Sequence, residues 1–90
     1  MRDGSITLRV KINGVRWRVT DQAVDGMCDH DGNLVYVDPK QKGRERLDTL
    51  IHEMLHATRP EMGEENVVAV AKALTTVLWR DGWRRRRHGR

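Results

Sequence analysis

Two runs near the start of the chain alternate apolar and polar side chains, which is the period of a half-buried β-strand. They cover residues 6–12 and 15–20, and the pair Asn13-Gly14 between them favours a tight type I′ turn. We therefore expect an antiparallel hairpin over residues 6–20.

A second hairpin is indicated by two shorter segments, residues 27–30 and 34–37, on either side of Asp31-Gly32. Asp38-Pro39 ends the second of these strands, because proline has no N–H to donate to a neighbouring strand. The two hairpins together predict a small antiparallel sheet of three to four strands.

After residue 43 the apolar period lengthens to that of a helix, and two helices are predicted. The first runs from about Arg44 to Thr58 and ends before Arg59-Pro60, since the residue before proline disfavours helical backbone angles. The second runs from about Gly63 to Trp79, and its inward face is predicted to comprise Val67, Ala71, Leu74 and Leu78. The chain is thus expected to be an α+β domain, a sheet followed by two packed helices.

Charge is divided unevenly along the chain. Residues 80–90 hold six arginines and one aspartate, whereas residues 1–79 hold eleven basic and twelve acidic residues and are nearly neutral. We therefore assign 1–79 to the folded domain and 80–90 to a basic, flexible C-terminal tail. Its arginines (Arg84, Arg85, Arg86 and Arg87) are candidates for sequence-independent contact with nucleic-acid phosphates, and the alternative is a solvated terminus or contact with an acidic partner.

Chain length and cysteine content limit the number of domains and the cellular compartment. Ninety residues with 38% hydrophobic side chains form one domain with a small core, for which a bound metal is a common stabiliser. Cys28 is the single cysteine, which excludes an internal disulfide and fits a reducing compartment. Residues 1–5 lead into no apolar signal segment and no apolar run is long enough for a membrane, so we expect a cytoplasmic protein.

The first predicted helix contains His52-Glu53-Met54-Leu55-His56, an HExxH motif. A spacing of four residues puts both imidazoles on one helix face, one turn apart, where they can bind a single zinc ion. Glu53 lies beside them, in position to accept a proton from a metal-bound water. The plain alternative is two histidines on a partly exposed face, but the intervening glutamate and the amphipathic setting favour a metal site.

A catalytic zinc site commonly has three protein ligands, so a third is expected where the chain returns after the first helix. Glu64 and Glu65 begin the second helix, and Glu64 shares the inward face with Val67 and Ala71. We therefore prefer Glu64 and keep Glu65 as the alternative. Acidic residues in a first helical turn also complement the helix dipole, so either glutamate could be structural.

These residues carry a resemblance to a known class. Residues 49–57, followed by Pro60 and by Glu64-Glu65-Asn66-Val67, resemble small zincins of the gluzincin type, in which HExxH lies on one helix and a glutamate on the next. More narrowly, the chain is similar over about residues 26–79 to compact HExxH proteins of phages and bacteria, and to SprT-like and ImmA-type protease cores.

The resemblance implies a set of roles. It makes His52, His56 and Glu64 the zinc ligands and Glu53 the general base. It also implies that a strand beside the cleft, either residues 26–30 or residues 34–37, pairs with an extended peptide substrate. No Tyr, His or Arg in the second half of the chain stands out as a transition-state stabiliser, which departs from the family pattern.

The leading interpretation is a zinc-dependent metallopeptidase acting on protein or peptide, with Glu53 as general base. An alternative from another class is a catalytically silent, zinc-stabilised binding module that contacts nucleic acid through the arginine tail. Glu53 favours the enzyme, because a structural site needs no such glutamate and is commonly closed by a fourth ligand, for which Cys28 is the candidate. A zinc hydrolase acting on a non-peptide amide is a third option.

Two weaker features stay open. Asp48, one turn before His52, is either a hydrogen-bond acceptor for an imidazole or an acid of the helix N-terminus. The triplet Cys28-Asp29-His30 is either a hairpin end with a buried cysteine or part of a second metal site that would need further ligands.

Overall fold

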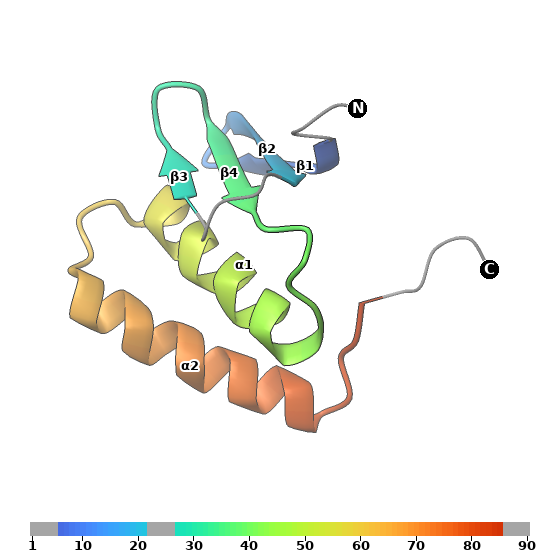
Figure 1. Cartoon of the computed structure of the whole chain (residues 1–90). Helices are drawn as coiled ribbons and strands as arrows, with labels where there is room; N and C mark the ends of the chain where they lie inside the picture. The colour runs from blue at the N-terminus through green and yellow to red at the C-terminus, as the bar shows by residue number, and fades with distance from the viewer. Residues whose placement is uncertain (1–5, 22–26, 86–90) are drawn as a thin grey trace.

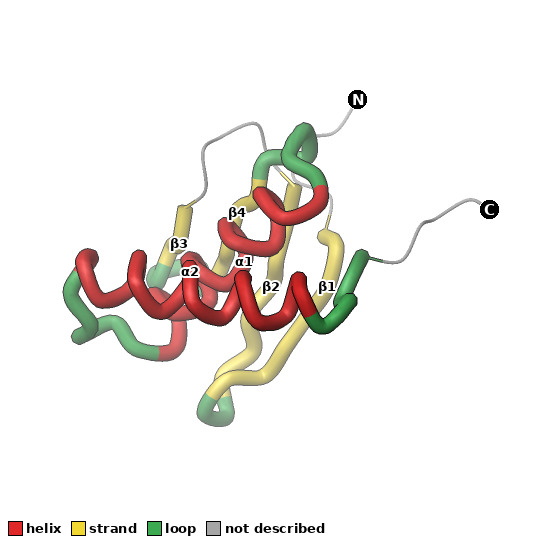
Figure 2. The backbone as a smooth tube through the Cα atoms, turned by 90° about the horizontal axis from the view of Figure 1, so that it is seen from below, coloured by secondary structure: helices red, strands yellow, loops and turns green. Residues whose placement is uncertain are grey.

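The computed structural model describes residues 6–21 and 27–85 of the chain. The sheet contains β1 (Ile6–Ile12), β2 (Val15–Asp21), β3 (Met27–Asp29) and β4 (Leu34–Val37), and it is followed by α1 (Gly43–Thr58) and α2 (Glu64–Arg80). α1 lies between the other two layers: it contacts β3 and β4 on one side and α2 on the other (Figure 1). Seen from below, α2 lies in front of α1 and the strands lie behind it (Figure 2). The predicted α+β fold is confirmed.

Both predicted hairpins are present. β1 pairs antiparallel with β2, and the two turn residues, Asn13 and Gly14, have positive φ angles of 50° and 82°, as a type I′ turn requires. β3 pairs antiparallel with β4. The sequence pattern therefore predicted each local pairing and its turn.

The junction between the hairpins differs from the prediction. The strand order is β1-β2-β4-β3, and β2 runs parallel to β4, so the sheet is mixed rather than wholly antiparallel. β2 and β4 are the two inner strands, and Val35 and Val37 of β4 are both 0% exposed, whereas the three-residue β3 lies at an edge. Residues 22–26, which join β2 to β3, lie outside the described residues.

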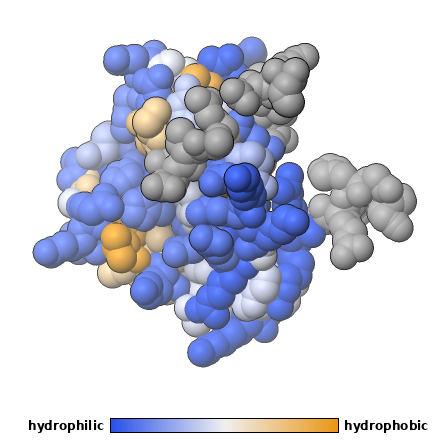
Figure 3. Space-filling view, viewed as in Figure 1, coloured by the Kyte–Doolittle hydropathy of each residue, from blue (hydrophilic) through white to orange (hydrophobic). Residues whose placement is uncertain are grey.

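The hydrophobic core lies between the sheet and α1. β2 contributes Trp17 and Val19, β4 contributes Val35 and Val37, and α1 contributes Ala57. The face shown in Figure 3 is mainly hydrophilic, with apolar side chains in small separate patches. The core is small, as expected of a domain of this size, and seven large apolar side chains of the described residues remain exposed.

The buried face of α2 is not the predicted one. Val67 and Ala71 are buried as expected, but Leu74 is 44% exposed and Thr75 is buried in its place, at 2%. Steps of four residues therefore follow the line of contact with α1. The Thr75 hydroxyl donates a hydrogen bond to Oδ1 of Asp48 on α1 over 3.4 Å. Asp48 thus binds α2, which explains its presence without a role at an imidazole.

Neither described helix combines the length and the apolar character that a membrane crossing requires.

A buried ion pair joins α1 to the end of β2. Nη2 of Arg46 lies 3.1 Å from Oδ1 of Asp21, and Arg46 is 7% exposed. Removing one partner leaves the other charge desolvated and unpaired, which costs more than the pair itself contributes. We expect Asp21→Asn to lower the free energy of unfolding by about 2 kcal/mol, and a double variant with Arg46→Met to recover most of it.

Urea unfolding followed by circular dichroism measures these differences. Arg59→Gln is the matched control, because its ion pair with Glu61 is exposed on both sides, at 65% and 68%. Exposed pairs contribute about 0–1 kcal/mol. A loss in Asp21→Asn no larger than that of the control would show that the Arg46–Asp21 pair does not stabilise the fold.

Candidate metal centre

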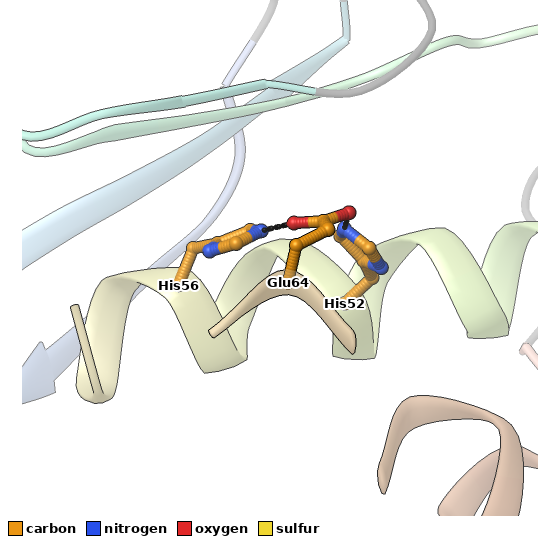
Figure 4. Close-up of side chains that lie close together, drawn as sticks. All are labelled: His52, His56 and Glu64. Atoms are coloured by element: carbon orange, nitrogen blue, oxygen red, sulfur yellow. Dashed lines mark ion pairs between the residues drawn. The ribbon is translucent and has the colours of Figure 1, made fainter. Parts of the chain in front are cut away.

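The two histidines of the HExxH motif and one glutamate meet in space. His52 and His56 lie one turn apart on α1, with ring centroids separated by 4.9 Å. Glu64, the first residue of α2, directs its carboxylate between them (Figure 4). Its Oε2 lies 3.2 Å from Nε2 of His52, and its Oε1 lies 3.0 Å from Nε2 of His56. One carboxylate therefore touches both imidazoles.

A short turn between the helices makes this contact possible. α1 ends at Thr58, whose hydroxyl donates to the carbonyl oxygen of Met54 over 2.9 Å. Pro60 lies in the turn that follows, where the Met62 amide donates to the carbonyl oxygen of Arg59 over 2.9 Å. α2 then begins at once, so its first turn lies beside the last two turns of α1.

The three side chains fit a metal ion. One donor atom from each of His52, His56 and Glu64 can be chosen so that all lie within 4.8 Å of one another. Zinc bonds of about 2.0–2.1 Å in tetrahedral geometry place ligand atoms roughly 3.3 Å apart. The two contacts of Glu64, at 3.2 and 3.0 Å, are close to that separation. Two imidazoles and a carboxylate suit zinc, although other transition metals accept the same donors.

The geometry favours Glu64 over Glu65 as the third ligand. Glu65 is exposed and does not belong to the cluster of possible ligands found among the described residues. The side chain of Glu64 is 64% exposed, compared with 23% for His52 and 25% for His56. The cluster is therefore open to solvent on the Glu64 side.

Glu53 is buried beside the cluster. Only 8% of the residue is exposed. Burial raises the pKa of its carboxyl group, His52 and His56 act to lower it, and Glu64 acts to raise it further. A carboxylate removed from water in this way accepts a proton more readily, which is what a general base requires.

One open cavity joins these groups to a second wall. It has a volume of about 460 Å³, and Cys28, His30, His52, Glu53, His56 and Glu64 line it. Cys28 and His30 come from β3 and the turn after it. We did not predict a role at this site for His30, although the triplet Cys28-Asp29-His30 was a signal in the sequence.

The triplet divides into separate roles. Oδ1 of Asp29 accepts hydrogen bonds from the amides of Asp31 and Gly32, at 3.0 and 3.3 Å, so Asp29 shapes the hairpin turn. Burial, then the negative charges of Glu53 and Asp29, raise the pKa of the Cys28 thiol to about 11. The thiol is therefore protonated at neutral pH when no metal is bound. Neither Cys28 nor His30 belongs to the ligand cluster of the described residues.

The arginine-rich end begins as ordered structure. Arg80 is the last residue of α2, one residue inside the segment assigned to the tail. The guanidinium carbon of Arg84 lies 3.5 Å from the centroid of the Trp79 ring, and its Nη1 donates to the carbonyl oxygen of Trp79 over 2.8 Å. Arg84 therefore packs on the end of α2, Arg85 is exposed, and Arg86 and Arg87 lie outside the described residues.

Comparison with known proteins gives no relative: no protein-family model matches the chain, and no curated protein or solved structure is significantly similar to it. The resemblance to gluzincins rests on the HExxH motif and the glutamate of the next helix alone.

The metal ligands can be tested by metal content. We expect wild-type protein and Glu65→Ala to retain a stoichiometric amount of zinc after gel filtration, and Glu64→Ala to lose it, because only Glu64 contacts both imidazoles. Inductively coupled plasma mass spectrometry measures the zinc. Glu65→Ala is the matched control, since it removes the same charge from the same helical turn. Retention of zinc in both variants would exclude the three-ligand site.

Glu53 should destabilise the metal-free domain at neutral pH. Its pKa is raised in the folded state, so the cost of the buried charge is absent below the unfolded pKa of about 4.3 and grows as the pH rises above it. We expect metal-free Glu53→Gln to melt at a higher temperature than metal-free wild type at pH 7, with the difference shrinking towards pH 4. Calorimetry with a chelator present measures it, and equal melting temperatures at pH 7 would contradict the assignment.

Proposed function

We propose that this protein is a zinc-dependent metallopeptidase. The observation that carries the proposal is the meeting of His52, His56 and Glu64 beside the buried Glu53, in a cleft open to solvent. A site that served only to hold the fold together would need neither the open side nor a desolvated carboxylate next to it.

The chain supplies the proton transfers of peptide hydrolysis. A zinc ion in this site would polarise the scissile carbonyl and lower the pKa of an attacking water. Glu53 is the group that accepts the proton of that water and later delivers it to the leaving amine.

The arrangement of the sheet favours one of the two strands considered for substrate docking. β4 is paired on both sides, by β2 and β3, and has no free edge. β3 is an edge strand, and Cys28 within it lines the cleft together with the metal cluster. An extended peptide that adds to the outer edge of β3 would pass the cluster, with affinity from main-chain hydrogen bonds. Residue 26 of the proposed docking segment lies outside the described residues.

The alternative is a zinc-stabilised binding module that contacts nucleic acid through its arginines. Two features, the position of Cys28 and the contacts of the arginines, weaken this alternative. Cys28, the candidate for a fourth and closing ligand, lies outside the ligand cluster found among the described residues. Arg80, Arg84 and Arg85 are all exposed in the described part of the tail, but Arg84 is engaged with Trp79.

Hydrolysis by purified protein decides between these functions. We expect zinc-loaded wild type to cleave an unfolded protein such as reduced, alkylated casein, and Glu53→Gln to bind zinc equally but to lose at least about 100-fold in rate, since general base catalysis contributes 10²–10⁴-fold. New N-termini identified by mass spectrometry measure cleavage. Glu61→Gln, which removes an exposed glutamate from the turn before α2, is the matched control. Zinc binding without cleavage by wild type would favour the binding module.

A further inference from the structure

A histidine from the sheet satisfies the backbone of a metal-ligand residue. The last carbonyl groups of a helix have no partner within it. In α1, the carbonyl oxygen of Leu55 accepts from the amide of Arg59 over 2.8 Å. The carbonyl oxygen of His56 accepts instead from Nε2 of His30, over 3.0 Å. A side chain at the end of β3 thus reaches the turn of α1 that carries a candidate zinc ligand.

The His30 ring is held in one orientation. A carbonyl oxygen can only accept, so Nε2 of His30 carries the proton that it donates to the His56 carbonyl. The ring lies edge-on to the buried Trp17, with centroids 5.5 Å apart and planes at 90°. The Cys28 sulfur lies 3.9 Å from both ring nitrogens, Nδ1 and Nε2. Three neighbours therefore fix a residue that is otherwise exposed.

We infer that His30 is a positioning residue for the metal centre. Its hydrogen bond fixes the backbone of His56, and hence the direction of the His56 imidazole, against the end of β3. The same contact sets the distance between the edge of β3 and the cluster of His52, His56 and Glu64. The statement about β3 rests on the proposed function. If a peptide substrate adds to the edge of β3, the His30 hydrogen bond sets the distance between that peptide and the metal.

The effect of losing the His30 hydrogen bond on zinc affinity can be estimated. Groups that orient metal ligands without touching the metal typically change metal affinity or activity by 10–100-fold when removed. A displacement of about 1 Å between substrate and metal has a comparable effect on rate. Loss of the His30 hydrogen bond should therefore be visible in zinc binding even where the fold is retained.

The test compares His30→Leu and His30→Gln with wild type. Leucine cannot donate, whereas the glutamine amide offers an N–H at about the reach of Nε2. We expect His30→Leu to raise the dissociation constant for zinc about tenfold, measured by competition with a chromophoric chelator, and His30→Gln to recover most of the affinity. On a peptide substrate, kcat of His30→Leu should fall about tenfold with a smaller change in KM, because the edge of β3 remains available.

Thr58→Val is the matched structural control. It removes a hydrogen bond to the Met54 carbonyl in the same region of α1 and touches neither histidine of the motif. We expect it to lower the melting temperature but to leave zinc affinity unchanged. An equal loss of zinc affinity in Thr58→Val and His30→Leu would reduce His30 to a structural role and overturn the inference, as would unchanged affinity in His30→Leu.

The readouts separate this inference from the proposed function. Weaker zinc binding by His30→Leu in a protein that cleaves no peptide would support the positioning role and reject the peptidase. Normal zinc binding and cleavage by His30→Leu would reject the positioning role and keep the peptidase. A wild type that binds no zinc would overturn both.

Discussion

The packing of α1 between the sheet and α2 is the constraint on which the rest of the structure depends. One side of the helix contributes Ala57 to the core with β2 and β4, and the other meets Val67 and Ala71 of α2. The candidate metal ligands His52, His56 and Glu64 lie where these two contacts approach each other, near the C-terminal end of α1. A small sheet and two helices can hold such a cluster because one central helix sets the position of both neighbours.

The same few residues affect both the stability of the fold and the chemistry of the site. Burial raises the pKa of Glu53, so its charge is expected to weaken the metal-free fold at neutral pH, and no lysine or arginine of the described residues lines the cleft beside it. The two imidazoles of the motif are its nearest compensating groups, and Glu64 competes for them. A divalent cation would satisfy both carboxylates at once. The arrangement is therefore expected to destabilise the metal-free fold and to favour a bound cation.

The sequence could predict what depends on neighbouring residues and could not predict what depends on packing between layers. The turn at Asn13-Gly14, the helix boundaries and the approach of Glu64 to the HExxH motif all follow from local spacing. The parallel pairing of β2 with β4 does not, because both strand orders leave the alternation of side chains unchanged. The burial of Thr75 depends on how α2 crosses α1. Because Thr75 is polar, the hydrophobic pattern did not mark it as a buried position. His30 acts through a carbonyl group, which no side-chain pattern reveals.

A bound metal would matter most for the attachment of α2. Among the elements of the described chain, α2 makes its substantial contacts with α1 alone, so no strand holds it in place. Its buried face is formed by Val67, Ala71 and Thr75, of which two are small or polar and contribute little apolar area. A zinc ion bridging Glu64 to both histidines would join the N-terminal end of α2 to α1 where apolar contact is thinnest. Because a metal that binds only the folded state stabilises it by mass action, the same three ligands would complete the fold and equip it for hydrolysis.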